Sequence, residues 1–299
     1  MKQEDRGNRK YLSKIDAALK LKGEPASYTY TDRDVILYNL GLGAKRTELP
    51  LVFEGSESFH VLPTFGIVPT YHSPAPYDMK DIIPNYDQRM LLHGEQYLEI
   101  KQWPIPTSGA LRSSTHLIEV VDKGNAALVR RGNTTVDSSG TELFYNESVA
   151  FIRGSGGFGG VKKPSDRGAA TAANDPPSRA PDKVIEEKTS PDLAALYRLM
   201  GDWNPLHIDP SFSSVGGFKE PILHGLATFG ITGKHVFQAY GPYRNLKVRF
   251  AGTVIPGETI VTEMWKVGSK VIYRARVKES EKVCISNAGV ELMDGKAKL

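Results

Sequence analysis

Three polar side chains that could do chemistry, Asp202, Asn204 and His207, lie within six residues of one another. Pro205 stands between them, so a continuous helix cannot run through this segment, and Asn204 is biased toward an extended backbone. A bent loop can turn an acid, an amide and an imidazole toward one point, whereas a helix brings together only residues three or four apart. The spacing therefore predicts a general acid/base pair with a polar residue that positions it.

A second helix is predicted to begin shortly after this loop, behind Pro221. Its apolar residues recur at intervals near three and four, as in a buried helix, at Ile222, Leu226, Phe229, Val236 and Phe237. Gly225 falls in the first turn, where backbone amides lack intrahelical partners and would stabilise a developing oxyanion. His224, taken alone, is predicted to bond nearby backbone, and Asp209 to shape the turn before Pro210.

An element before the loop must position it. Thr189 and Ser190 precede Pro191, a combination typical of a helix start, and Gly201 is a typical stop. One face between them is apolar, with Leu193, Leu196, Tyr197 and Met200. The chain is thus expected to leave a helix at the point where its polar residues gather.

Two runs of sequence carry a family resemblance: residues 201–209, Gly-Asp-Trp-Asn-Pro-Leu-His-Ile-Asp, and residues 223–230, Leu-His-Gly-Leu-Ala-Thr-Phe-Gly. They resemble the hydratase 2 motif of R-specific 2-enoyl-CoA hydratases, as in the hydratase 2 region of peroxisomal multifunctional enzymes type 2. The resemblance extends from about Tyr28 to the C-terminus. It implies an α+β fold of the MaoC-like, double hot-dog kind, with two repeats that each wrap an antiparallel sheet around a long central helix.

The resemblance also implies an activity. The expected reaction is reversible hydration of trans-2-enoyl-CoA to (3R)-3-hydroxyacyl-CoA in peroxisomal fatty-acid β-oxidation, without a metal or other cofactor. The expected catalytic groups are the side chains of Asp202, His207 and Asn204 and the backbone amide of Gly225. The residues expected to bind the acyl-CoA are His93, Gly94, Lys123, Trp203, Pro205, Leu206 and Phe250.

Without the resemblance, three of these binding residues have ordinary structural explanations. His93 lies where a strand is expected to start, Lys123 lies in a turn where lysines are normally solvated, and Phe250 is an ordinary core residue. Their assignment to the acyl-CoA site therefore depends on the family.

An internal repeat divides the chain. Residues 62–67, Leu-Pro-Thr-Phe-Gly-Ile, match residues 226–231, Leu-Ala-Thr-Phe-Gly-Ile, at every position except the second. The first copy has Gly43-Ala44-Lys45 where the second has its acid and histidine. We therefore expect one active site per chain, with the first copy shaping a substrate cavity.

The expected organisation follows from this repeat. Residues 1–27 are a lead-in or linker, 28–160 the first hot-dog repeat, 161–183 a linker, 184–296 the second repeat with the hydratase 2 motif, and 297–299 a targeting tripeptide. Strands are expected at residues 110–121, 126–135, 142–152, 246–250, 259–267, 271–277 and 283–292. The glycine-rich residues 154–160 lack the context of a nucleotide loop and are interpreted as a strand exit.

Composition limits the remaining possibilities. The net charge of +4 does not argue for nucleic acid, and the single cysteine, Cys284, excludes a disulfide framework. No stretch approaches the roughly 20 apolar residues of a membrane span. Ala297-Lys298-Leu299 resembles the Ser-Lys-Leu peroxisomal address, which predicts binding to the peroxisomal import receptor and localisation in the peroxisome.

Two alternatives to the hydratase stay open. One is another hot-dog acyl-CoA enzyme, such as a thioesterase or a dehydratase; the other is a non-catalytic module that binds acyl-CoA. In each case exposed sheet edges favour pairing of copies, and we expect a homodimer.

Overall fold

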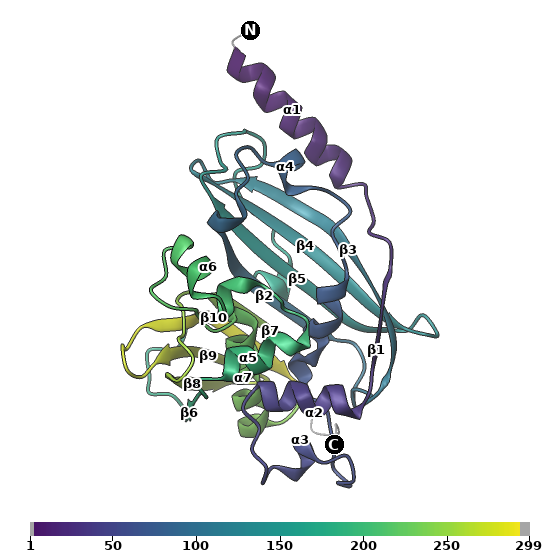
Figure 1. Ribbon diagram of the computed structural model, residues 1–299, viewed down its shortest axis with the longest axis vertical. Helices are drawn as coiled ribbons and strands as arrows, with labels where there is room; N and C mark the ends of the chain where they lie inside the picture. The colour runs from purple at the N-terminus through teal and green to yellow at the C-terminus, as the bar shows by residue number, and fades with distance from the viewer. Residues whose placement is uncertain (1–2, 294–299) are drawn as a thin grey trace.

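One antiparallel sheet of ten strands runs through the computed structural model, which describes residues 3–293. The strand order is β1-β3-β4-β5-β2-β7-β10-β9-β8-β6, so each half of the chain supplies one half of the sheet. The halves meet where β2 pairs with β7, with Tyr97 opposite Lys247 and Leu98 opposite Leu246. Figure 1 shows the two halves joined along this line.

The first half of the sheet is built from long strands. They are β1 (Ala26–Tyr30), β2 (Leu91–Ile100), β3 (Gly109–Asp122), β4 (Ala126–Asp137) and β5 (Glu142–Arg153). The helical segments of this half are α1 (Gln3–Ala18), α2 (Asp32–Gly41), α3 (Leu49–Val52), α4 (Met79–Ile82) and the 3-10 helices Pro63–His72 and Gln88–Met90.

The second half repeats the strand pattern with shorter strands. They are β6 (Lys183–Lys188), β7 (Tyr243–Phe250), β8 (Thr259–Val267), β9 (Lys270–Val277) and β10 (Val283–Leu292). Its helices are α5 (Leu193–Tyr197), α6 (Pro210–Val215), α7 (Gly225–Tyr240) and the 3-10 helices Arg198–Met200 and Pro205–His207, with Gly168–Ala170 in the connection before them. All seven predicted strands are present, with ends that differ by at most three residues from the predicted ones.

The two repeats differ in their central helix. In the second repeat α7 is sixteen residues long, and its middle, from Ala227 to Phe237, is buried without interruption. In the first repeat the matching segment is a ten-residue 3-10 helix with Pro69 inside it. Proline lacks the amide proton that an α-helix needs and clashes with the preceding turn. The long central helix expected for both repeats is therefore found only in the second.

One apolar core serves both repeats. The buried ring of Tyr38 on α2 lies at centroid distances of 5.4 Å from Phe65 and 6.5 Å from Tyr197 on α5. Figure 1 shows α2 and α5 next to each other, and a side chain at Gly41 would meet Tyr197. The elements that hold the second repeat's polar loop are thus packed directly on the first repeat.

The segment before the first repeat is structured. The sequence predicts a linker or frayed lead-in over residues 1–27, but α1 occupies most of it and β1 begins at Ala26. Ile15 and Ala18 are buried in a second, smaller apolar cluster under the first half of the sheet. Among residues 10–18 of α1, these two side chains are the buried ones, and two apolar positions give a weak periodic signal in sequence.

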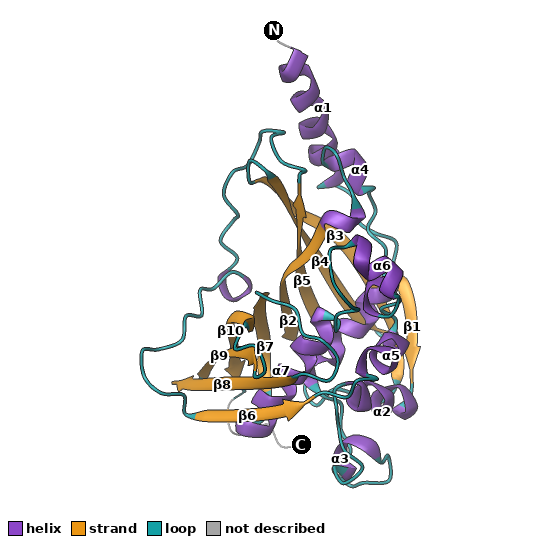
Figure 2. Cartoon of the chain, turned by 60° about the vertical axis from the view of Figure 1, so that its left-hand side comes forward, coloured by secondary structure: helices purple, strands orange, loops and turns teal. Residues whose placement is uncertain are grey.

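Ion pairs and hydrogen bonds hold the connection between the repeats against the strands of the first repeat (Figure 2). Asp122 accepts hydrogen bonds from the amides of Gly157 and Gly159, and it pairs with Lys162 at 2.6 Å. Further along, Arg167 pairs with the buried Glu147. The glycine-rich amides therefore bind a carboxylate of the chain itself, in keeping with their interpretation as a strand exit.

The tripeptide at 297–299 lies outside the described residues. Among the described residues, no helix is long and apolar enough to cross a membrane.

Candidate active site

The polar loop leaves the helical segment at Gly201, whose φ of +116° turns the chain in a way that suits glycine. The α-helix before it begins at Leu193, slightly later than the predicted start at Thr189 and Ser190. Asn204 then caps a single 3-10 turn, because its side-chain oxygen accepts from the amide of Leu206 at 3.1 Å. Asp202 accepts from the amide of Asn204 at 3.4 Å. These bonds produce the bent loop that the spacing predicted.

His207 is fixed by one of its two ring nitrogens. Its Nδ1 lies 2.8 Å from the carbonyl oxygen of Ile222, so Nδ1 carries the proton and donates. Nε2 is then the nitrogen that can accept a proton. The side chain is 8% exposed, so this imidazole works in a largely dry environment.

The ring of His224 lies against the loop residues, a position that was not predicted from the sequence. Its ring lies 3.9 Å from that of His207, centroid to centroid, and its Nε2 donates to the carbonyl oxygen of Asp202 at 3.2 Å. The predicted bond to backbone is therefore present, and its acceptor is the polar loop itself. Nδ1 of His224 is buried without a hydrogen-bond partner among the described residues. The signal that could have identified this residue is its place beside Gly225.

Asp202, His207 and His224 form one cluster, in which one polar atom from each side chain lies within 4.8 Å of the others. An acid and an imidazole at this separation can share one water or one proton. The same three side chains are ligands that a transition metal accepts, and each imidazole keeps one nitrogen that is not bonded to backbone. Acid/base chemistry at the cluster requires no such ion.

Burial shifts the proton affinities within the cluster. It raises the pKa of Asp202, against the opposing pull of His207, and it lowers the pKa of His207. It lowers the pKa of His224 to about 3, so this ring is neutral at ordinary pH. Perturbed pairs of this kind are typical of groups that exchange protons during catalysis.

Gly225, the residue predicted to bind an oxyanion, directly follows His224 of this cluster. Helix α7 begins at Gly225, and the first amides that bond back to His224 are those of Ala227 and Thr228. The amide of Gly225 therefore precedes the helix's own hydrogen bonds and is available to a ligand. A side chain at Gly225 would approach the ring of Phe250 to 3.3 Å, so glycine keeps this approach open.

Phe250 connects the oxyanion position with the first repeat. Its ring lies 4.7 Å from that of His93, which is half-buried near the start of β2, and Nε2 of His93 is 3.1 Å from the carbonyl oxygen of Glu95. Burial lowers the pKa of His93 to about 4. The structure thus brings His93, Phe250 and Gly225 together, with Gly94 next to them on the strand.

The other expected binding residues surround the cluster less closely. Trp203 is 55% exposed, and the guanidinium of Arg198 lies 4.7 Å from its ring centre. Pro205 and Leu206 form the 3-10 turn of the same loop. Lys123 lies in the exposed turn between β3 and β4, separated from β2 by β5, and does not join the cluster.

Comparisons with known proteins cover nearly the whole chain. Residues 28–154 match the MFE-2 hydratase 2 N-terminal domain, and residues 172–288 match the MaoC like domain. A peroxisomal hydratase-dehydrogenase-epimerase of Neurospora crassa is 58% identical over 94% of this chain and 32% of its own length. A probable enoyl-CoA hydratase 2 of Dictyostelium discoideum is 38% identical over 94% of this chain and 96% of its own length. The chain spans about a third of the length of the Neurospora relative, and of the peroxisomal multifunctional enzyme type 2 from mouse and the peroxisomal hydratase-dehydrogenase-epimerase from yeast that it also matches.

Solved structures agree with these matches. A MaoC-like dehydratase from Phytophthora capsici is 32% identical, with a TM-score of 0.81 over 93% of this chain and 98% of its own. A Mycobacterium tuberculosis protein described as a double hotdog fold aligns with a TM-score of 0.57 over 91% of this chain and 95% of its own, at 14% identity. The fold expected from the sequence, α+β with two hot-dog repeats, is confirmed.

Proposed function

The chain belongs to the enoyl-CoA hydratase 2 family of MaoC-like hotdog proteins, and we propose that it catalyses reversible hydration of trans-2-enoyl-CoA to (3R)-3-hydroxyacyl-CoA. Relatives named peroxisomal support the expected localisation and a place in fatty-acid β-oxidation. The observation that carries the proposal is the buried acid/imidazole cluster beside the free amide at the start of α7.

The proposed reaction assigns each group one task. Asp202 and His207 hold a water between them, and one of them takes its proton while the oxygen attacks C3 of the enoyl group. The pair then delivers a proton to C2 on the same face, so the proton count of the site is restored. His224, neutral and bonded to the backbone of Asp202, holds the acid in place. Asn204 shapes the turn that brings the imidazole back to the acid.

The thioester needs a second interaction, because negative charge develops on its oxygen as C3 is attacked. The amide of Gly225 at the positive end of α7 is placed to donate to this oxygen. A single donor of this kind typically contributes about 100- to 1000-fold to the rate. Phe250 and His93 would border the thioester on the side of the first repeat.

Partners beyond the substrate are part of the proposal. We propose a homodimer, for which the charged edge strand β6 is a poor surface and the edge strand β1 a better one. Binding to the peroxisomal import receptor through Ala297-Lys298-Leu299 is proposed on the sequence of the tripeptide alone.

Loss of the enoyl thioester's ultraviolet absorbance on addition of the protein to crotonyl-CoA tests the proposed reaction. Chiral analysis of the 3-hydroxyacyl product tests its stereochemistry. Absorbance that stays constant while the ligand binds tightly would replace the enzyme with a binding module. Release of free thiol in place of hydration would replace it with a thioesterase.

A further inference from the structure

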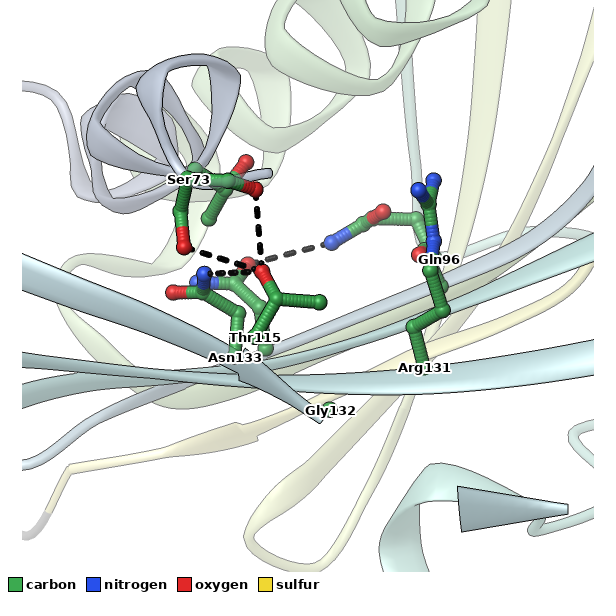
Figure 3. A pocket seen from close by; sticks show the side chains of 9 residues that line it. Ser73, Gln96, Thr115, Arg131, Gly132 and Asn133 are labelled. Carbon is green, nitrogen blue, oxygen red and sulfur yellow. Dashed lines mark hydrogen bonds between the residues drawn. The ribbon is translucent and has the colours of Figure 1, made fainter. Parts of the chain in front are cut away.

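A polar cavity of about 70 Å³ lies on the inner face of the first repeat's sheet, beneath the end of the 3-10 helix Pro63–His72 (Figure 3). Hydroxyl, amide and guanidinium groups line it, although apolar clusters occupy the inner face on both sides. A cavity of this polarity and size holds several waters or a small polar group of a ligand.

Strand register arranges the cavity floor in two rows. Arg131 on β4 lies opposite Ser148 on β5, and Ser148 lies opposite Gln96 on β2. The next row holds Asn133 opposite Asn146. Because side chains of directly paired residues share a face, both rows point into the cavity.

Most of these groups are already paired with each other. The amide of Asn133 donates to the hydroxyl of Thr115 at 3.0 Å, and the amide of Gln96 donates to Asn146 at 3.0 Å. Figure 3 shows Thr115 bonded both to Asn133 and to Ser73. The row of Asn133 and Asn146 is therefore held in a hydrogen-bond network with Thr115 and Gln96, which makes the floor of the cavity rigid.

Arg131 and Ser148 differ from the rest. Among the described residues, neither the exposed guanidinium nor the neighbouring hydroxyl has a hydrogen-bond or ion-pair partner. Arg130, one residue earlier and on the opposite face, is in contrast paired with Glu119 and Glu147. A free guanidinium beside a free hydroxyl at the mouth of a polar cavity is a suitable receptor for an anionic oxygen group.

The cavity adjoins the candidate active site. His93 lies opposite Ala150 on β5, two residues from Ser148 and on the same face of that strand. The positive charge of Arg131, opposite Ser148, adds to the burial that lowers the pKa of His93. His93 contacts Phe250, which borders Gly225. A thioester bound at Gly225 therefore has other parts within reach of the cavity.

We propose that this cavity is a substrate subsite in which Arg131 and Ser148 bind an anionic oxygen group of the acyl-CoA. The inference rests on the proposed function. Two sources share this chemistry: a phosphate of the CoA moiety and a carboxylate at the far end of the acyl chain. A purely hydrocarbon chain would leave the guanidinium and hydroxyl to water.

Kinetics of Arg131→Gln with four thioesters test the subsite. Two are CoA esters of trans-2-enoyl chains of equal length, with and without a terminal carboxylate. The other two are the N-acetylcysteamine thioesters of the same acyl groups, which carry no phosphate. We expect kcat/KM to fall about tenfold to a hundredfold for substrates with the recognised anion, relative to the thioester that carries none.

The pattern of loss identifies the source. Loss confined to the carboxylate-bearing chains assigns the anion to the acyl end, and loss confined to the two CoA esters assigns it to a phosphate. Equal kcat/KM changes for all four thioesters, or no change for any, overturn the subsite. Wild-type protein inactive with all four would instead refute the hydratase proposal, so the two failures are distinct.

Matched variants complete the design. Ser148→Ala should show the same pattern with about a two- to tenfold loss, and Arg131→Lys should recover part of the loss because it keeps the charge. Arg112→Gln removes another exposed arginine, on the adjacent strand β3, and should behave as wild type. Equal losses in Arg112→Gln and Arg131→Gln would assign the effect to net charge and overturn the subsite.

Discussion

Individual residues of the cluster divide into groups that exchange protons and groups that hold them. Asp202 and His207 each keep a polar atom free to face a ligand, whereas His224 uses Nε2 to bind the loop backbone. Burial favours the neutral forms of all three, and proximity favours charge separation within the pair. In the proposed mechanism the proton passes between these two side chains and the substrate.

Removal of either proton-exchanging side chain should abolish hydration and preserve the fold. We expect Asp202→Asn or His207→Gln to lower kcat about 100- to 10,000-fold, because each variant removes general acid/base catalysis. Hydration kinetics with crotonyl-CoA and circular dichroism measure the two effects. Asp209→Asn is the matched control, since asparagine also caps the exposed start of α6, and its activity should be normal.

The pH dependence of kcat/KM should reflect the raised pKa of Asp202 and the lowered pKa of His207. A base at Asp202 is lost as pH falls, and burial moves that loss above the ordinary value of 3.8. The lowered pKa of His207 keeps the imidazole neutral as pH falls through 6.5. Activity should therefore fall on the acid side with a midpoint above 3.8, and the apparent values belong to the pair.

Acid unfolding must be separated from this loss. Because the pKa of His224 is about 3, below its unfolded value of about 6.5, its contribution to stability is complete above pH 6.5 and declines as pH falls toward 3. Circular dichroism at each pH identifies the range in which the protein is folded. A midpoint at or below 3.8 within that range would contradict a buried catalytic aspartate.

At the scale of elements, the first turn of α7 packs against the end of β7, where Gly225 faces the ring of Phe250. Gly225 does not have a positive φ, so its backbone conformation does not require glycine. The ring of Phe250 favours glycine, because a Cβ at this position would lie only 3.3 Å from that ring and the ring would have to move slightly. We expect Gly225→Ala to lower kcat/KM by at least about tenfold with little change in the melting temperature, since alanine suits a helix better than glycine. Hydration kinetics and thermal melts measure the two effects.

A smaller side chain at position 250 should recover part of the activity lost in Gly225→Ala. In the double variant Gly225→Ala/Phe250→Leu the smaller side chain gives the new methyl group room, so hydration should exceed that of Gly225→Ala alone. Kinetics of the four members of the cycle measure this coupling. Independent, additive losses would show that the ring does not limit the approach to the amide.

Elements with strong local patterns were predictable, and others depended on contacts distant in sequence. The strands of both repeats alternate clearly, and the Asp202–His207 loop is defined by Pro205 and its spacing. His224 required knowledge that its helix start folds back on the loop. The polar subsite at Arg131 required strand register, which sets residues from β4, β5 and β2 side by side.

At the scale of the whole molecule, the two repeats share one sheet and one main core. The β2–β7 pairing makes the sheet continuous, and the main core draws residues from both halves. The internal repeat in the sequence shows neither feature. Taken alone, that repeat predicts two separable domains. The proposed active site depends on this union, because Asp202 and His207 come from the second repeat and His93 comes from the first.

Lys234 is a buried link between the repeats. It is 1% exposed in the middle of α7, and its Nζ donates to the carbonyl oxygen of Leu42 in the first repeat at 2.7 Å. The same Nζ pairs with Glu187 on β6 at 2.8 Å, and Glu187 also contacts His235 at 3.1 Å. One ammonium group thus joins the central helix, the edge strand and the end of α2.

Lys234→Met should lower the stability of the entire molecule in one transition. It leaves Glu187 without its main partner and the Leu42 carbonyl without a donor, which costs about 3–5 kcal/mol. Calorimetry should show a single melting transition displaced downward by about 10 °C. The exposed neighbour Lys188→Met is the matched control and should melt as wild type. Two transitions, with only one displaced, would show that the repeats unfold separately and that this link does not unite them.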